Sequence, residues 1–395
     1  MRRNVAALAI LASVILAAAC SETNTVPSDT AAERAEIAAT SAPKFWETNA
    51  AADWNELATS LAARRAVDVS RMYAYLSLAQ LRAAEAAEAI EPHSPTSSAI
   101  GAASATVLAS FFPADVAEIE AALDAQAAAK PWPGAKHQDF ATGEALGRSI
   151  GAKVLTFAQG DRAGQADPGT PPTGDGYWKW TVGGPMVRGN YRARPFFLAS
   201  DDEFLPPPPP AFGSQAFLDA LAEVRAIAAN RTPAQVAIAN YWNLNQSGRS
   251  GAAPNNLAVE LIRSHRVKEA KAARILFLMN AASFDALVGC FGAKYTYWLI
   301  RPPQADPSIA TVFPTPPHPS YPSAHSCGSG ATTGVLALEF PDEATRVEAF
   351  ALEAGLSRLY AGIHYRFDMA AGVALGRAVA AKAVAADLDE VAVLP

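Results

Sequence analysis

A histidine and an aspartate four residues apart, His364 and Asp368, are the pair best suited to chemistry in this sequence. On a helix, residues at this spacing share a face, so the carboxylate could bond one imidazole nitrogen. That bond would fix the tautomer and make the other nitrogen a better nucleophile or ligand. Arg358 lies six residues before His364, out of phase on one continuous helix, and Gly362 provides a break that can bring both to one pocket.

A second candidate segment runs from Pro319 to His325 and precedes a predicted helix of small residues. Ser323 stands where an N-cap belongs, and free backbone N–H groups at a helix start form a ready anion site. His325 lies in the predicted first turn, where it could serve as general acid or base. Taken alone, the segment is explained equally well by a capping Ser beside a surface His.

The third candidate is a pair of cations, Lys294 and Arg301, seven residues apart. Seven residues are about two helical turns, so both side chains are predicted to point to one side of a helix. Pro302 disfavours helix at Arg301 and would end the element there. Arg binds an anion by its fork and Lys as a point charge. By itself the pair is more typical of a solvated basic face.

If the three segments converge, they supply three cations, two histidines, one acid and the amides of a helix start. Phosphoryl chemistry without a metal needs this set: charge neutralisation, an in-line nucleophile and an acid for the leaving group. The sequence therefore predicts an enzyme that holds a tetrahedral oxyanion of the phosphate type between Lys294 and Asp368.

The same residues resemble a known family, the type 2 phosphatidic acid phosphatase (PAP2) and vanadium haloperoxidase superfamily. The resemblance rests on K-x6-R-P from Lys294, P-S-x-H from Pro322, and S-R-x5-H-x3-D from Ser357, in that order. The middle motif usually has Gly where this chain has Ala324. The Ala324 amide can still donate, but a positive φ there would cost about 1–2 kcal/mol.

The resemblance implies a role for each motif residue. Three cations would hold the oxyanion, a serine hydroxyl and an alanine amide would complete its site, one histidine would be the acid–base residue, and an aspartate would orient the other histidine. The three cations are Lys294, Arg301 and Arg358, and the serine and alanine are Ser323 and Ala324. The acid–base histidine is His325, and Asp368 would orient His364.

Two activities are implied, and one alternative needs no catalysis. In a haloperoxidase, His364 would ligate vanadium, with vanadate as cofactor and peroxide and halide as substrates. In an acid phosphatase without cofactor, His364 would attack a phosphomonoester and form a phosphohistidine. A non-catalytic oxyanion-binding lipoprotein would need neither His325 nor the His364–Asp368 pair. The extra helical region before the motifs and a Trp/Pro-rich loop favour the soluble bacterial haloperoxidase-like branch.

The elements that position these residues are predicted to be helices, in an all-α fold. Apolar periodicity and Ala abundance indicate them, whereas residues 160–213 are rich in Gly, Pro and aromatics and are predicted to form a loop belt packed on the helices. The expected division is 43–213 for an N-terminal helical region with the belt, and 214–390 for the catalytic core. Helices are expected at about 45–90, 98–128 (interrupted at Pro113), 137–158, 214–228, 232–243, 255–265, 267–290, 293–300, 325–339, 342–359 and 366–385.

The N-terminus is typical of an export signal. Residues 1–19 combine two arginines with a short apolar stretch that leads to Cys20. They resemble a bacterial lipoprotein signal, with Cys20 lipidated and residues 20–42 as a flexible tether; an ordinary cleaved signal is the alternative. We expect a periplasmic protein anchored to the outer membrane by lipid alone. The net charge of −6 and the absence of a basic run argue against nucleic acid as a partner.

Three further sets of residues have chemistry of their own: two cysteines, four histidines and four asparagines. Cys290 and Cys327 could form a disulfide in an oxidising compartment or remain separate buried thiols. The other histidines show no metal-ligand spacing and are interpreted as surface or capping residues: His93, His137, His265 and His318. Four asparagines flank a Gly/Ser loop at 247–251 that would line a substrate entrance, although turn chemistry also explains them: Asn243, Asn245, Asn255 and Asn256.

Overall fold

The computed structural model describes residues 49–90, 96–129, 137–180, 188–243 and 249–386. Throughout these residues the regular structure is helical, which confirms the all-α prediction, and the β-type pairing is one isolated bridge between Tyr177 and Leu299. The predicted signal segment, Cys20 and the tether lie outside the described residues. So do His93 and Asn245.

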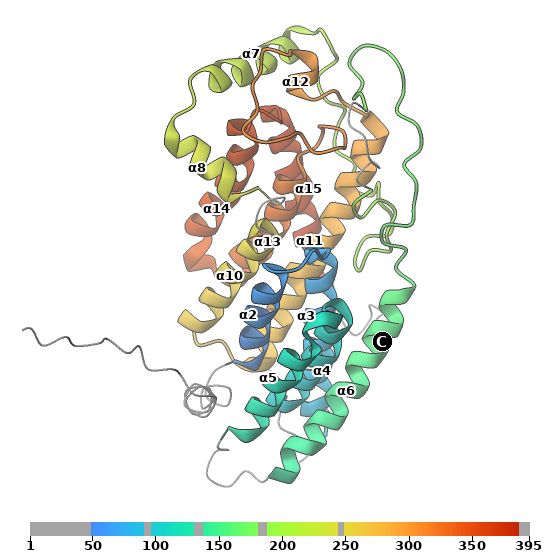
Figure 1. Ribbon diagram of the computed structural model, residues 1–395, viewed down its shortest axis with the longest axis vertical. Helices are drawn as coiled ribbons and strands as arrows, with labels where there is room; N and C mark the ends of the chain where they lie inside the picture. Colours follow the sequence, from blue (N-terminus) through green and yellow to red (C-terminus); the bar gives the residue numbers. More distant parts are fainter. Residues whose placement is uncertain (1–48, 91–95, 130–136, 181–187, 244–248, 387–395) are drawn as a thin grey trace, which may run out of the picture.

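The N-terminal helices form the lower half of the molecule in Figure 1. Where one helical run was predicted over 45–90, the structure has two helices. The second begins after Asp68, whose side chain caps it by accepting from Arg71 N at 3.1 Å. The expected interruption at Pro113 is a bend of 120°. The elements are α2 (Ala50–Ala62), α3 (Val69–Ala89), α4 (Thr96–Phe111), η2 (Pro113–Asp115), α5 (Val116–Ala128) and α6 (His137–Gln159).

The C-terminal helices carry the three motifs. One continuous helix, α11, replaces the two predicted at 267–290 and 293–300, because Gly292 sits inside it without a break. The elements are α7 (Gln215–Ala229), α8 (Pro233–Tyr241), α10 (Arg249–Ser264), α11 (Glu269–Tyr297), α12 (Pro302–Ala305), α13 (Ala324–Glu339), η3 (Pro341–Glu343), α14 (Ala344–Tyr360) and α15 (Arg366–Ala385).

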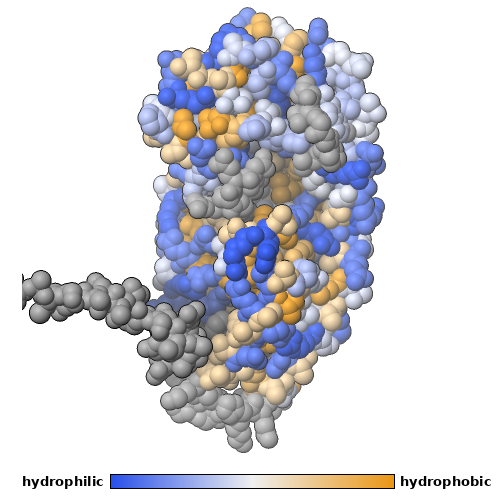
Figure 2. All heavy atoms as spheres, viewed as in Figure 1, coloured by the Kyte–Doolittle hydropathy of each residue, from blue (hydrophilic) through white to orange (hydrophobic). Residues whose placement is uncertain are grey.

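Helix α11 is the axis of the core. It has the length and hydropathy of a membrane span, but 89% of its most apolar window is buried inside the molecule, so here it is a core helix. Figure 1 shows it running between the N-terminal helices and the α13–α15 group, and one hydrophobic cluster includes residues of α3, α11, α13 and α15. On the face shown in Figure 2, the coloured residues mix polar and apolar types. The division at residue 213 stays a prediction.

The described part of the belt is fixed to α11. The Asp285 carboxylate, fully buried on α11, accepts from three consecutive belt amides, Phe196 to Leu198, at 2.7–3.1 Å. Just after the end of α11, Trp298 O accepts from Trp178 N of the belt at 2.7 Å, and Ile300 N donates to Gly176 O at 2.9 Å. These bonds hold the chain extended just before Arg301.

Candidate functional site

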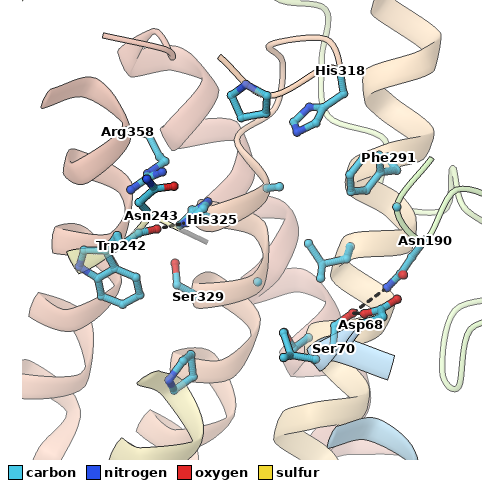
Figure 3. Close-up of a pocket in the computed structure, with 18 of the residues that line it drawn as sticks. Asp68, Ser70, Asn190, Trp242, Asn243, Phe291, His318, His325, Ser329 and Arg358 are labelled. Carbon is cyan, nitrogen blue, oxygen red and sulfur yellow. Dashed lines mark hydrogen bonds between the residues drawn. The ribbon is translucent and has the colours of Figure 1, made fainter. Parts of the chain in front are cut away.

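A cavity of about 460 Å³ lies where the three motifs meet (Figure 3). Its wall includes four of the predicted site residues, Ala324, His325, Arg358 and His364, and also His318, which precedes the second segment. The remaining predicted site residues do not line it. They are buried behind this wall: Lys294, Arg301, Ser323 and Asp368.

The predicted pairing of His364 with Asp368 is present, with Nδ1 and Oδ2 2.7 Å apart. Its origin differs from the one expected, because His364 precedes α15 and only Asp368 lies within the helix. The contact is therefore made by the turn into α15 rather than along one helical face. Asp368 Oδ2 also accepts from Ser320 Oγ at 2.6 Å and from Tyr365 N at 3.2 Å.

The charge state of His364 follows from its surroundings. Burial and the neighbouring cations, Arg301 first, hold its pKa well below the usual range, so the ring is neutral and the contact with Asp368 is a hydrogen bond rather than an ion pair. A carboxylate only accepts, so Nδ1 carries the proton. Nε2 then presents a lone pair, which accepts from Arg301 Nη1 at 3.2 Å. An attack or a ligation through Nε2 would require this bond from Arg301 to be exchanged.

Arg301 is fully buried and does not share a helix with Lys294. α11 ends at Tyr297, and Trp298 takes a left-handed conformation with φ of 49°. The helical-face argument was therefore wrong, although the residue does reach the site. Its guanidinium contacts both His364 and His318 Nδ1, the latter at 3.0 Å, and donates to His318 O and Ile363 O at 2.9 and 2.8 Å. Burial lowers its pKa only to about 10, so it stays charged.

Lys294 holds the loop before α13. Its Nζ donates to the carbonyls of Pro319 and Ser320 at 3.0 and 2.9 Å, and also to that of Pro322. An ammonium has three protons, so these bonds use all of them. Burial lowers the pKa of Lys294 to about 8. Direct contact with an oxyanion would require one of the three bonds to be exchanged.

Arg358 is the cation that lines the cavity. It donates from Nε to Ser357 Oγ at 2.8 Å and from Nη2 to Ala239 O at 3.0 Å. The predicted break at Gly362 is present, with φ of +77°, and separates α14 from the segment that carries His364. Burial, followed by repulsion from Arg301, lowers the pKa of Arg358 to about 9, which leaves it protonated at neutral pH.

The start of α13 provides unpaired donors. The first i→i−4 bond runs from Cys327 N to Ser323 O, so the three preceding amides have no helical acceptor. Ser323 occupies the N-cap position but makes no capping bond, and its buried Oγ has no partner among the described residues. Ala324 is helical rather than at positive φ, so the expected strain is absent.

His325 lies in the first turn of α13, as predicted, and lines the cavity. Its Nε2 donates to Trp242 O at 2.8 Å, because a carbonyl can only accept. Burial, then Arg358, holds its pKa well below the usual range, so Nδ1 of the neutral ring carries a lone pair. In this neutral state Nδ1 can accept a hydrogen bond.

Two residues of the site were missed by the sequence analysis. His318 was interpreted as a surface or capping residue, yet it is 8% exposed, bonded to Arg301 and packed edge-on against Phe291. Ser320 is fully buried and donates to Asp368. Both lie in the Pro-rich loop just before the recognised motif, and their closeness to it was the signal that could have found them.

Of the two alternatives for Cys290 and Cys327, the structure has the free thiols, and both are fully buried. Their thiols are hydrogen-bonded to each other, and Cys290 Sγ also donates to Pro322 O at 3.7 Å. α11 is already joined to the loop before α13 through Lys294, so no bridge is needed to hold the two together.

Comparison with known proteins agrees with this geometry. Residues 272–389 match the model of the PAP2 superfamily. Among solved structures, a bacterial vanadium-dependent iodoperoxidase aligns with a TM-score of 0.70 and 24% identity, over 87% of this chain and 95% of that one. A bacterial vanadium-dependent chloroperoxidase in its apo form aligns with a TM-score of 0.59 and 13% identity, over 80% and 92%. No curated protein sequence matches.

The residues that carry the three motifs are therefore similar to the PAP2 superfamily. The chain as a whole has the fold of the bacterial vanadium-dependent haloperoxidases, N-terminal helices included.

Proposed function

We propose that this protein is a vanadium-dependent haloperoxidase that uses hydrogen peroxide to oxidise a halide. The observation that carries the proposal is that His364 lines the cavity while its Nδ1 donates to Asp368 at 2.7 Å, which leaves the lone pair on Nε2. Among the described residues, no group of three or more His, Cys, Asp and Glu could hold a metal ion. A cofactor that needs one imidazole ligand and many hydrogen-bond donors fits such a site.

The residues fit vanadate as an oxyanion. Three features supply positive potential and unsatisfied donors: the amides that start α13, the buried Ser323 hydroxyl without a partner, and the Arg358 guanidinium in the cavity wall. Arg301 and Lys294 add two buried charges behind the wall. Bound vanadate would supply a centre that activates peroxide for two-electron oxidation of a halide.

The protein's own residues would perform the proton and charge steps. His325 Nδ1 would take a proton from incoming peroxide and later return it to a leaving oxygen. Arg358 would stabilise negative charge on the oxyanion, in a buried site where such contacts are strong. Asp368 would keep His364 in the tautomer that offers Nε2, and Arg301 would keep that ring neutral by its charge.

The second candidate is an acid phosphatase in which His364 Nε2 forms a phosphohistidine. The same lone pair and the same donors support it, since phosphate and vanadate have nearly the same shape. One experiment separates the two: purified protein, with and without added orthovanadate, is assayed for peroxide-dependent iodide and bromide oxidation and for phosphomonoester hydrolysis. Halide oxidation that depends on vanadate is the expected result. Hydrolysis without vanadate, and no halide oxidation, would replace the proposal by the phosphatase.

We also propose that the protein works in the periplasm, held to the outer membrane through lipidated Cys20. The basis is the pattern of residues 1–20. Wild type should sediment with membranes, and Cys20→Ser should release a soluble form or an unprocessed precursor. An unmodified N-terminus on protein found free in the periplasm would contradict the proposal.

A further inference from the structure

Cys290 and Cys327 form a thiol pair in the interior, where α11 packs against the first turn of α13. Both side chains are fully buried, and the two thiols are hydrogen-bonded to each other. Cys290 Sγ donates its proton to Pro322 O at 3.7 Å, so Cys327 is the donor in the bond between the sulfurs. Two thiols in contact need only lose two protons and two electrons to become a disulfide. The pair is therefore arranged for oxidation.

The two sulfurs differ in acidity. Burial opposes ionisation of Cys290, but the hydrogen bond from Cys327 and the charge of Lys294 outweigh it and lower the pKa of Cys290. Burial raises the pKa of Cys327 well above its usual range, and its bond to Cys290 adds to the rise. The thiolate, rather than the thiol, attacks an oxidant. Cys290 is therefore placed to react first, and Cys327 to complete the bond.

The pair lies behind the cavity wall. Phe291 of α11 and Gly328 of α13 line the cavity, and each directly follows one of the two cysteines in the sequence. Figure 3 shows Phe291 and His325 in the cavity wall on these two helices. Gly328 has no side chain to cover Cys327 from this side. Burial excludes a protein oxidant from the folded chain, whereas a molecule as small as peroxide has only this wall to pass.

We infer that Cys290 and Cys327 are a modification site, at which hydrogen peroxide converts the thiol pair into a disulfide. The Cys290 thiolate attacks one peroxide oxygen, the O–O bond breaks, and the hydroxide that leaves takes up the proton from Cys290 to form water. The Cys327 sulfur then attacks the sulfenic acid at Cys290, the S–O bond breaks, and hydroxide leaves with the Cys327 proton as a second water. Two thiols are oxidised, and one peroxide is reduced.

This chemistry needs no vanadate and goes beyond the proposed function. Haloperoxidase activity supplies only the reason for peroxide to enter the cavity. The modification and the halide oxidation can therefore be tested independently of each other.

The bridge would close a loop of about 37 residues that contains much of the candidate site, including Arg301, His318 and Ser323. In the reduced protein, Lys294 of α11 holds this loop by donating to three of its carbonyls. A disulfide stabilises mainly by restricting the unfolded chain, and more so for a longer loop. The oxidised protein should therefore be harder to unfold. The geometry of the site should be kept, because the bond joins two side chains that are already in contact.

The first test is peptide mapping of the purified full chain, reduced and without added vanadate. After treatment with excess hydrogen peroxide, denaturation and alkylation, mass spectrometry should find the peptides of Cys290 and Cys327 joined by a disulfide. A thiol reductant should separate them. Peroxide-treated protein in which both cysteines are still alkylated would overturn the inference, and so would oxidation of Cys290 to sulfinic acid without a bridge.

The second test uses single variants to check the order of reaction. In Cys327→Ser, peroxide should leave Cys290 as a sulfenic acid, which dimedone captures. In Cys290→Ser, Cys327 should react at least about tenfold more slowly, because its thiol stays protonated. Equal rates in the two variants would contradict the assigned order. Peptide mapping of the wild type decides the bridge by itself if either variant fails to fold.

The third test measures what the bridge does. The Tm of the wild type should rise by at least about 3 °C after peroxide treatment and return to its starting value after reduction. Cys327→Ser, treated in the same way, is the matched control and should show no rise. An unchanged or lower Tm in the bridged wild type would overturn the stabilising role.

A halide-oxidation assay on the same preparations separates this inference from the proposed function. Bridge formation in a protein that does not oxidise halides with vanadate would keep this site and remove the proposed function. Halide oxidation by a protein that forms no bridge would do the reverse.

Discussion

Two aspartates, both fully buried, organise two different regions of this molecule. Asp285 fixes the belt to α11, and Asp368 orients His364. Each carboxylate accepts three hydrogen bonds. At Asp285 the bonds come from three backbone amides and use both oxygens. At Asp368 they come from a hydroxyl, an imidazole and one amide, all on Oδ2, and Oδ1 has no partner in the described structure.

The difference distinguishes an anchor from a reactive group. Backbone donors cannot change protonation, so Asp285 only holds the chain in place. Asp368 shares its bonding oxygen with a titratable ring, so its charge controls which His364 nitrogen carries the proton. Burial is the leading cause of both raised pKa values, about 7 for Asp285 and about 6 for Asp368. The bonding pattern, rather than the pKa, therefore separates their roles.

The largest effect is expected from His364→Ala. Either chemistry should fall by at least about 1,000-fold in kcat, because the reacting nitrogen is lost. Far-UV circular dichroism should show the fold intact. His265→Ala is the control: this ring lies near Asp342 and Glu343, and Nε2 is 3.5 Å from the Glu343 carboxylate. Retention of more than a small fraction of activity by His364→Ala would remove that residue from the mechanism.

Asp285→Ala should act on the fold. It leaves three belt amides without their acceptor, so the free energy of unfolding should fall by about 3 kcal/mol or more. Urea titration measures this change. At temperatures where the variant stays folded, kcat should remain within about threefold of wild type. A selective loss of kcat in a stable variant would show that Asp285 is more than an anchor.

Asp368→Asn should reduce kcat about 10–100-fold, less than His364→Ala, because orientation is weakened while the reacting atom remains. The pKa of Asp368, about 6, predicts that wild-type activity falls as the pH drops through 6. The effect of Asp368 on stability depends on pH in the opposite direction. Because folding raises the pKa of Asp368, its contribution to the free energy of unfolding is greatest below a pH of about 3.8 and is lost as the pH rises through about 6. The Asn variant should lack this acid limb. A pH–rate profile identical to that of wild type would contradict the assignment.

The smallest effect is expected from Ser320→Ala. The Ser320 hydroxyl is the largest influence that lowers the pKa of Asp368, so its removal should move the acid limb to higher pH and reduce kcat at pH 6 about three- to tenfold. Ser308→Ala is the matched control, since Ser308 Oγ donates to the half-buried Asp306, away from the cavity, at 2.7 Å. If the two variants had the same pH profile, Ser320 would be a packing residue only.

The sequence by itself identified the helices, because apolar periodicity and Gly/Pro interruptions are local signals. It also brought together His325, Arg358, His364 and Asp368, because their spacing follows from local turns and from a motif. Even so, the argument for His364 and Asp368 was right in outcome and wrong in cause, since only one of them lies in a helix.

Tertiary structure alone decided the rest. Whether Lys294 points to an anion or to carbonyls depends on a loop 25 residues away in sequence, and no spacing rule covers that distance. The same holds for His318 and Ser320, polar residues in a Pro-rich loop whose burial comes from packing against α11 and α15. Asp285 looked like any acid on an apolar helix until the belt, 87–89 residues distant, supplied its three amides. A hydrogen bond between segments far apart in the sequence leaves no local sequence pattern, because such a pattern reports only the helix or loop to which each partner belongs.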